Sequence, residues 1–238
     1  MRRMRLALLT LGVLSLPLIV TTAHAASTNA PAAKPPTTKA GPSAAQLLAK
    51  VNGCSQISKG KFRTDDETSA NIAVCGTKGS KTAPAWWKAD MDIDCDGVQT
   101  SRCNKSKDPW YQNDTAYHTS KGKPFTADVT HYFVIPQDSA SAWHFQRDSG
   151  IKLGDVAAVI YNNKVIYAVF ADTGPTNIIG EASYATARDL GINPDPKNGG
   201  VDSGVTYIVF PNSRVSPQED NNAITAKGEQ MANKFVNG

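Results

Sequence analysis

Residues Val165–Ile192 read VIYAVFADTGPTNIIGEASYATARDLGI, and the expected architecture follows from the order of these residues. The first seven, Val165–Ala171, are apolar or aromatic and rich in β-branched types, which is typical of a strand covered on both faces. Asp172 follows directly, and Thr173-Gly174-Pro175 is a turn signal. This half of the stretch therefore predicts a buried strand with a carboxylate at its end.

The second half predicts a helix over Ala182–Leu190, which ends at Gly191 in the C′ position. Glu181 lies in the loop that leads into this helix. Two acids, Asp172 and Glu181, are thus carried on loops of a rigid scaffold, as general acid/base catalysis requires. Spacing alone favours the simpler interpretation, in which Asp172 caps the turn and Glu181 is a solvated residue near a helix start.

Other parts of the chain also show the pattern of short strands. His131–Ile135 ends at a proline, and Val205–Phe210 does the same. Val156–Tyr161 is joined to the strand at Val165 through Asn162-Asn163-Lys164, which predicts a tight hairpin. Short β-branched strands with few long helices predict a small barrel with helical additions. A final helix is expected to begin with Ser216 as its cap, Pro217 at N1 and Glu219 at N3.

The N-terminus has the composition of a secretory signal peptide over residues 1–25. Arg2, Arg3 and Arg5 precede the apolar run Leu6–Val20, which is short for a membrane span. Residues 1–25 hold three arginines and no acid, so their removal lowers the net charge from +4 to +1. We therefore expect a secreted, extracellular protein that associates with neither nucleic acid nor, after removal of the signal, a membrane.

Residues 26–42 are rich in Ala, Pro, Thr and Lys, and they predict a disordered linker. A single folded domain is expected over 43–238, beginning with a short helix. Ser43 and Gln46 form a capping box at the start of this helix. About 195 residues are enough to bury a sizeable core in one domain.

Four cysteines, Cys54, Cys75, Cys95 and Cys103, lie in the first third of the expected domain. An even count in an exported chain indicates two disulfides, for which three pairings are possible. Nearness in sequence favours Cys54–Cys75 and Cys95–Cys103. A zinc site is the alternative, although the chain contains no C-x-x-C pair.

Four aspartates fall within the seven residues Asp90–Asp96. The pattern Asp92-x-Asp94-x-Asp96-Gly97 matches the opening of an EF-hand loop, but Cys103 stands where the bidentate Glu belongs. A complete EF-hand is therefore rejected. A looser calcium loop, an acidic subsite for a cationic ligand, and Asx turns all stay open. Mutual repulsion among these carboxylates predicts that something positive lies near them.

Four segments together resemble glycoside hydrolase family 75, the endo-chitosanases of fungi and some actinobacteria. They are Met91–Gly97, Tyr132–Pro136, Phe170–Pro175 and Ile179–Ser183. The resemblance extends from about Cys54 to Phe210. It implies hydrolysis of chitosan with inversion of the anomeric centre, and it assigns the essential acid pair to Asp172 and Glu181.

A weaker resemblance bears on the fold. Ala171–Pro175, Ile179–Ser183 and the Ala-rich run are similar to the core segment of double-psi β-barrels, including rare lipoprotein A, expansins and family 45 endoglucanases. Glu181 stands where those proteins carry an Asp. The resemblance implies a mainly β fold, with a six-stranded double-psi β-barrel-like core, added helices and a disulfide-linked N-terminal segment.

The implied reaction needs a protonated acid on one side of the scissile bond and a carboxylate that holds water on the other. We assign Glu181 as the acid, because Ile178 and Ile179 can desolvate it, and Asp172 as the base; the reverse assignment stays open. Chitosan is cationic, so its groove should offer carboxylates and aromatic faces. Asp92, Asp94 and Asp96 are candidates for the first role. Candidates for the second are Trp86, Trp87, Trp110, Tyr111, Tyr132 and Trp143.

Catalysis of this kind needs no cofactor or metal, and a monomer is expected. Two other classes of function stay open. One is a peptidoglycan lytic enzyme, and the other is a non-catalytic, expansin-like module that binds cell walls.

Overall fold

The computed structural model describes residues 41–138 and 143–238. The expected signal peptide, residues 1–25, and the expected linker as far as residue 40 lie outside the described residues. The elements, in order, are α1 (Ala44–Lys50), β1 (Ala85–Asp94), β2 (Tyr132–Pro136), α2 (Phe145–Ser149), β3 (Val156–Tyr161), β4 (Lys164–Gly174), β5 (Glu181–Ser183), α3 (Tyr184–Leu190), β6 (Val201–Phe210) and α4 (Asn221–Asn237).

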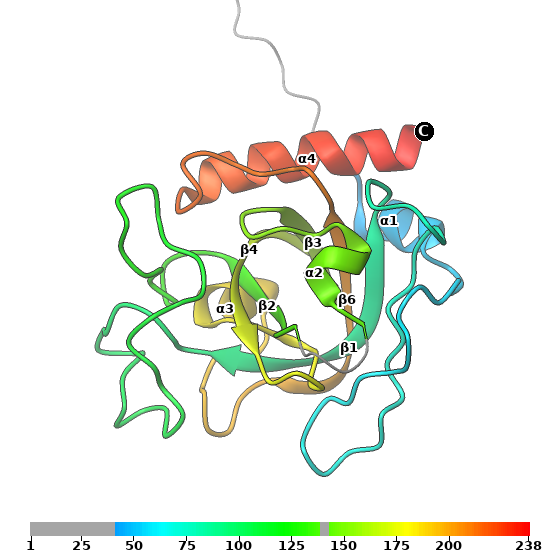
Figure 1. Cartoon of the computed structure of the whole chain (residues 1–238). Helices are drawn as coiled ribbons and strands as arrows, with labels where there is room; N and C mark the ends of the chain where they lie inside the picture. The colour runs from blue at the N-terminus through cyan, green and yellow to red at the C-terminus, as the bar shows by residue number, and fades with distance from the viewer. Residues whose placement is uncertain (1–40, 139–142) are drawn as a thin grey trace, which may run out of the picture. The chain divides into compact units, whose positions relative to one another are not determined.

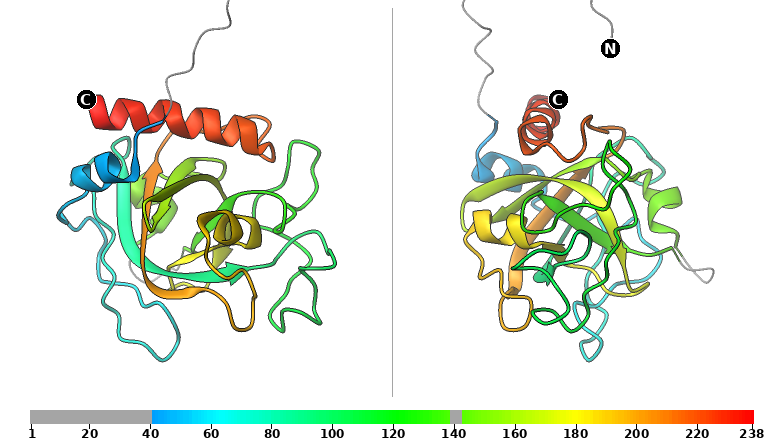
Figure 2. Two further views of the ribbon diagram at one scale, coloured as in Figure 1. Left: turned by 180° about the vertical axis from the view of Figure 1, so that it is seen from behind. Right: turned by 90° about the vertical axis from the view of Figure 1, so that its left-hand side faces the viewer.

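The six strands close into one barrel in the order β1-β5-β2-β4-β3-β6. Strand β1 pairs with β5 in parallel, as does β2 with β4, and the remaining neighbours are antiparallel. The carboxyl ends of β1 and β4 lie on the side of the barrel away from α4 (Figures 1 and 2). Polar side chains at these two strand ends therefore share one side of the molecule.

The barrel interior is filled by apolar side chains from alternate strand positions. Trp87 of β1 stacks on Tyr207 of β6 with ring centroids 5.3 Å apart, and Phe145 of α2 meets Trp87 edge-on at 5.5 Å. Burial of aromatic side chains of this size supplies a large share of the hydrophobic stabilisation of a small barrel.

A second apolar cluster lies outside the barrel, where α4 packs on β3 and β4 and contacts α1 (Figure 1). Ile224 of α4 is fully buried in this cluster, next to strand residues such as Val169. Within the described residues, no helix is long and apolar enough to cross a membrane.

Several expectations are confirmed. The barrel has six strands and is closed, and the disulfides pair Cys54 with Cys75 and Cys95 with Cys103. The zinc alternative is therefore wrong. The capping box at Ser43 begins α1, and Asn162 and Asn163 turn the β3–β4 hairpin with φ of 44° and 64°. Positive φ at both turn residues is the requirement that Asn meets most readily after Gly.

Strand β1 was not expected, because its aspartates suggested loop or turn chemistry. The structure instead makes Ala85–Asp94 a strand of ten residues that pairs with β5 and β6. Its odd-numbered residues, including Met91 and Ile93, are buried in the barrel, while Lys88 and Asp92 are exposed. Burial of the apolar face therefore outweighs the low strand propensity of aspartate.

Two boundaries near the predicted acid pair also differ. Thr173 and Gly174 were expected in a turn, yet they extend β4, because β2 continues to pair with them at Ile135 and Pro136. Glu181 was expected in a loop, but it is the first residue of β5.

The helix that follows β5 begins later than expected, at Tyr184. Ser183 caps it by accepting the backbone N–H of Thr186 at 3.2 Å, and Gly191 ends it with φ of 85°.

The start of the C-terminal helix is also later than expected. Glu219, the expected N3 residue, accepts the backbone N–H of Ser120 at 2.9 Å and is therefore not part of a capping box at Ser216. Asp220 caps α4 instead, by accepting the backbone N–H of Asn222 at 2.8 Å.

Candidate active site

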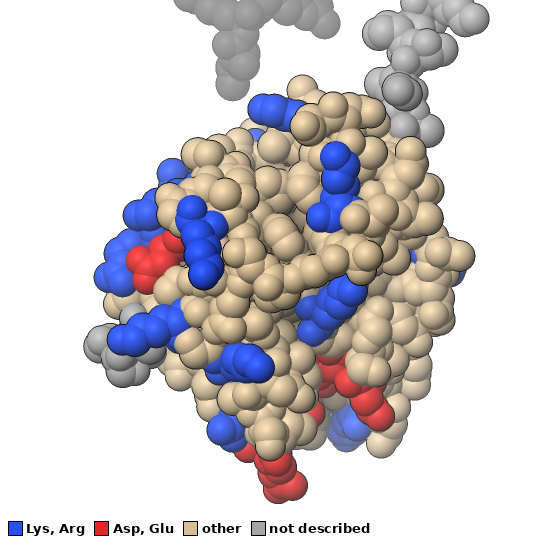
Figure 3. Space-filling view, turned by 90° about the vertical axis from the view of Figure 1, so that its right-hand side faces the viewer, with Lys and Arg blue, Asp and Glu red and all other residues tan. Residues whose placement is uncertain are grey.

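A groove of about 930 Å³ opens where β1, β4 and β5 meet three surface loops. Ten of its lining residues are acidic and one is basic, Lys197. The acids are Asp65, Asp66, Glu67, Asp92, Asp94, Asp96, Asp108, Asp172, Glu181 and Asp195. On the face drawn in Figure 3, Lys and Arg side chains are spread widely, while acidic side chains lie mainly along its lower part. The groove is therefore strongly acidic on a chain of net positive charge.

The barrel topology brings Asp172 and Glu181 to the two sides of one residue, Val134 of β2. Glu181 of β5 pairs with Val134 on one side, and Asp172 of β4 pairs with it on the other. Two strand spacings, about 10 Å, therefore separate the Cα atoms of the two acids. Both side chains line the groove.

Gly174 makes room for the carboxyl group of Glu181. A Cβ atom at position 174 would lie 3.2 Å from Glu181 Oε2, which is tighter than ordinary van der Waals contact. A larger residue at this position would therefore displace the carboxyl group from its place in the groove.

Asp172 is buried, with 7% of its surface exposed, and its two oxygens have different surroundings. Oδ1 accepts the backbone N–H of Thr173 at 2.7 Å and that of Ala116 at 3.0 Å. Oδ2 has no hydrogen-bond partner among the described residues. Burial raises the pKa of Asp172 to about 6, although the two N–H groups oppose this rise.

Glu181 holds its proton more tightly than Asp172 does. Burial, and then the neighbouring charges of Asp92 and Asp172, raise the pKa of Glu181 to about 8. Ile178, one of the apolar neighbours expected to desolvate Glu181, lines the groove beside it, while Ile179 is buried in the barrel. Environments that separate the pKa values of two carboxyl groups are typical of an acid and a base that work together.

Three further aspartates from the acidic run line the groove. Asp94 accepts the backbone N–H of Asp96 at 2.6 Å, and Asp96 accepts that of Gln112 at 2.6 Å. Carboxylate oxygens of Asp94, Asp96 and Asp172 lie within 4.8 Å of one another. Asp92 is exposed and pairs with Glu181 across the β1–β5 contact. The run thus combines a local turn bond at Asp94 and a longer-range bond from Gln112 to Asp96 with a groove-facing position for Asp92, Asp94 and Asp96.

Positive charge was expected near this run. Within the described residues, no Lys, Arg or His forms an ion pair with any acid of the groove. Lys105 and Lys197 are close enough to lower the pKa of Asp108, but burial still raises it overall. The chain itself therefore leaves most of the negative charge of the groove uncompensated.

Among the aromatic candidates, Trp110 has the most exposed ring at 85%, and it lines the groove. Tyr132 was expected to bind substrate, but it is fully buried and does not line the groove. Its hydroxyl group donates to the backbone carbonyl of Asp96 at 3.0 Å, so Tyr132 stabilises the backbone of the acidic run from the interior of the protein. Trp87 and Tyr111 are also buried, and Trp86 and Trp143 contact other parts of the chain.

Sequence reasoning missed five acids that the fold brings to the groove. Asp65, Asp66 and Glu67 form an acidic cluster that was visible in the sequence. Asp108 and Asp195 are isolated in loops far from the family motifs, and only the folded arrangement places them in the groove.

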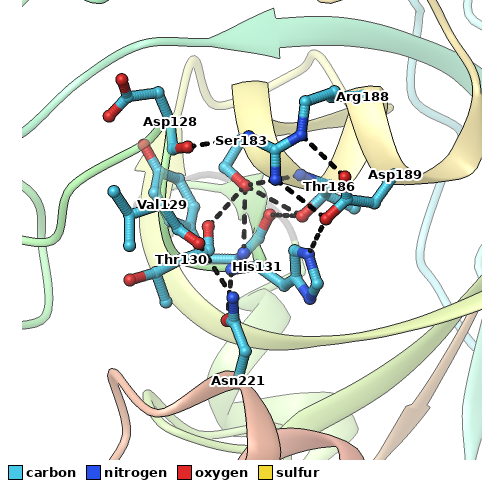
Figure 4. A network of polar contacts seen from close by, with 10 residues as sticks. Asp128, Val129, Thr130, His131, Ser183, Thr186, Arg188, Asp189 and Asn221 are labelled. Atoms are coloured by element: carbon cyan, nitrogen blue, oxygen red, sulfur yellow. Dashed lines mark hydrogen bonds and ion pairs between the residues drawn. The ribbon is translucent and has the colours of Figure 1, made fainter.

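A polar network holds β5 and α3 against β2 (Figure 4). Ser183 Oγ accepts the backbone N–H of Tyr132 at 3.2 Å and donates to the carbonyl of Thr130 at 2.8 Å. Asp189 of α3 accepts two hydrogen bonds from Arg188 and lies 2.7 Å from His131 Nε2. Since Ser183 is two residues from Glu181 on a strand of three, this network fixes the position of Glu181.

Two carboxylates on either side of an open groove are the arrangement on which glycoside hydrolases depend. Residues 91–237 match the family model described as fungal chitosanase of glycosyl hydrolase group 75, and the chain belongs to this family. The match includes both Asp172 and Glu181.

Individual relatives carry the same description. An endo-chitosanase B of Aspergillus oryzae is 31% identical over 148 residues, which is 60% of this chain and 61% of the relative. An endo-chitosanase of Aspergillus fumigatus is 28% identical over 150 residues, covering 60% of this chain and 63% of the relative. The chain thus spans about three fifths of the length of these curated relatives. Among solved structures, the Streptomyces papain inhibitor matches with 19% identity and a TM-score of 0.32, covering 52% of this chain and 94% of the inhibitor.

The raised pKa values of Glu181 and Asp94 in the groove, and of Asp90 close to it, predict that the protein loses stability as the pH rises. In the folded chain, burial raises the pKa of Asp90 and of Glu181 to about 8, and that of Asp94 well above its usual range. In the unfolded chain these groups ionise near pH 4. Between these values the unfolded state has lost protons that the folded state retains, so rising pH favours unfolding.

In metal-free buffer, the Tm should therefore be lower at pH 8.5 than at pH 5. Glu181→Gln should reduce this difference, because the neutral amide cannot ionise. Asp195→Asn is the matched control from the same groove. Backbone hydrogen bonds lower the pKa of Asp195, so this substitution should leave the difference unchanged. A Tm that is constant or rises over this range would contradict the electrostatic account.

Proposed function

We propose that this protein is a secreted endo-chitosanase that hydrolyses β-1,4 bonds between glucosamine units of chitosan. The observation that carries the proposal is the groove itself, in which eight further acids and a single lysine surround the Asp172–Glu181 pair. A polymer of glucosamine carries ammonium groups, and a groove of this charge attracts and orients such a chain. Family membership supports the same substrate class.

Glu181 acts as the general acid and Asp172 as the general base. With pKa values of about 8 and about 6, Glu181 is protonated and Asp172 is ionised near neutral pH. Oδ2 of Asp172 is buried and has no hydrogen-bond partner among the described residues, so it is the oxygen that would take the proton from a water molecule bound in the groove, while Oδ1 is held by two N–H groups. The Cα atoms of the two acids stand about two strand spacings apart, and inversion needs their carboxyl groups about 6.5–9.5 Å apart, with room for a water molecule between them.

Substrate binding involves three further acids of the groove, Asp92, Asp94 and Asp96. Asp92 faces the groove next to Glu181 and contributes negative charge close to the scissile bond. Asp94 and Asp96 contribute negative charge beside Asp172. Trp110, which is exposed at the edge of the groove, offers an aromatic face to a sugar ring or to its ammonium group.

Export fits the chemistry of the folded chain. Two disulfides persist in oxidising compartments, and the polymeric substrate is extracellular. The release of reducing ends from soluble chitosan tests the activity. If the protein instead clears bacterial cell walls and leaves chitosan intact, it is a peptidoglycan lytic enzyme. If it binds chitosan without cleaving it, the groove belongs to a binding module.

Replacement of either acid should abolish most of the activity without unfolding the protein. Glu181→Gln cannot donate a proton and Asp172→Asn cannot accept one, so each should lower kcat by about 10²–10⁴-fold. The double variant should be little worse than the more damaging single variant, because both groups act on one transition state. Asp66→Asn, at an exposed acid of the same groove, should retain most of the activity.

These variants are compared by initial rates of reducing-end release, with circular dichroism to verify folding. If Glu181→Gln retains more than about a tenth of the wild-type activity, Glu181 is not the acid.

The pH dependence of the rate should be bell-shaped, measured as kcat on soluble glucosamine oligomers. The rate should rise as Asp172 ionises, near pH 6, and fall as Glu181 loses its proton, near pH 8. Because the two groups interact, the two midpoints belong to the pair and not to single residues. A rate that keeps rising to pH 9 would contradict the assignment of a carboxyl group as the acid.

A further inference from the structure

A second acidic cluster lies at the edge of the proposed catalytic groove, where the loop around Asp65 meets strand β1. Carboxylate oxygens of Asp65, Asp90 and Asp92 lie within 4.8 Å of one another. Oxygens bound to a single calcium ion at 2.3–2.6 Å are at most about 5 Å apart, so the spacing suits one shared ion. Asp90 and Asp92 come from alternate positions of one strand, which places both side chains on its outer face.

Asp90 provides an independent sign of a missing partner. Only 3% of its surface is exposed, and its Oδ1 has no hydrogen-bond partner within the described chain. This oxygen packs against Gly180, where any Cβ atom would overlap it, and Gly180 has φ of 119°. A buried carboxylate without a partner is costly, and it is normally compensated by a charged group or a metal ion.

The three carboxylates also differ from the other acids of the site in their hydrogen bonds. Asp94, Asp96 and Asp172 each accept at least one backbone N–H. Across the described ranges, no other residue donates a hydrogen bond to the carboxylates of Asp65, Asp90 or Asp92, and no Lys, Arg or His pairs with them. In the part of the chain that the structure describes, only the backbone N–H of Asp90 itself bonds to this cluster, and no cationic side chain balances its charge.

We propose that Asp65, Asp90 and Asp92 bind a calcium ion. Three carboxylates are hard oxygen ligands, and calcium tolerates a partly open, irregular set that water completes. An ammonium group of the substrate would suit the same charge, but Asp90 does not line the groove. A sugar-borne ammonium cannot reach this buried carboxylate, whereas a bare ion can.

The ion would fasten the loop around Asp65 to the strand beside Glu181. This loop is already paired to the segment before β5, since Arg63 N–H donates to Asn177 and Ile179 N–H donates to Arg63. Asp92 N–H donates to the carbonyl of Gly180 at 2.7 Å, so β1 reaches the same segment. Calcium would add a direct link between this loop and β1. It would thereby hold the neighbouring acids of the loop, Asp66 and Glu67, in their positions along the groove.

Calcium titration of the mature protein, stripped of metal and free of saccharide, tests the site. Isothermal titration calorimetry should give one calcium ion per chain. At about 100 times the Kd, calcium should raise the Tm by about 5–10 °C, because only the folded chain holds the three ligands together. Omitting saccharide makes the outcome independent of the proposed chitosanase activity.

Two variants and one control make the assignment specific. Asp65→Asn and Asp90→Asn should each abolish the calcium-dependent rise in Tm, and Asp65→Asn removes an exposed loop carboxylate, so its folding is not at risk. Asp66→Asn, the next residue in the same loop, should keep the rise. The proposal is overturned if wild-type protein binds no calcium at 10 mM, about ten times the Kd of the weakest protein calcium sites, or if Asp65→Asn shows the wild-type rise in Tm.

Discussion

The backbone pairing of Val134 is the constraint on which the active site depends. This single residue of β2 pairs with Glu181 on one side and with Asp172 on the other. The distance between the Cα atoms of the two acids is therefore set by sheet geometry and not by flexible loops. Barrel closure fixes β2 in turn, and the hydrogen bonds of Ser183 fix β5, a strand too short to hold its register alone.

The apolar core of the barrel has to offset the cost of burying the acids of the groove, which destabilises the folded chain. Ten acids line this groove, and burial raises the pKa of both members of the proposed catalytic pair. The stacked Trp87–Tyr207 pair and the apolar core around it supply stability that offsets this cost. Uncompensated charge suits a function in which the positive partner arrives from outside. A cationic polymer, as proposed, would bring one such partner to the groove, and a calcium ion at Asp90 would bring another to its edge.

Much of the fold was predictable from local patterns, and the parts that were missed depend on tertiary contacts. The buried strand at Val165, the Asn162–Asn163 hairpin and the two disulfides follow from hydrophobicity, turn chemistry and cysteine count. Strand β1 was missed because its aspartates were interpreted as turn residues, although apolar residues alternate with polar ones along much of Ala85–Asp94. The candidate acid pair could be named from the family motif. Its geometry could not be predicted, because it depends on strand pairings with β2 that the local sequence does not indicate. Distant acids such as Asp195 reach the groove only through the fold.

The central claim is that Asp172 activates water while Glu181 protonates the leaving group across the groove. Proton NMR of the first products released from a glucosamine oligomer tests it most directly, because attack by water inverts the anomeric centre of a β-1,4 bond. The account predicts that the α-anomer appears first and that the β-anomer grows only by mutarotation. An initial β-anomer would contradict it, since Asp172 would then act as a nucleophile in a retaining reaction.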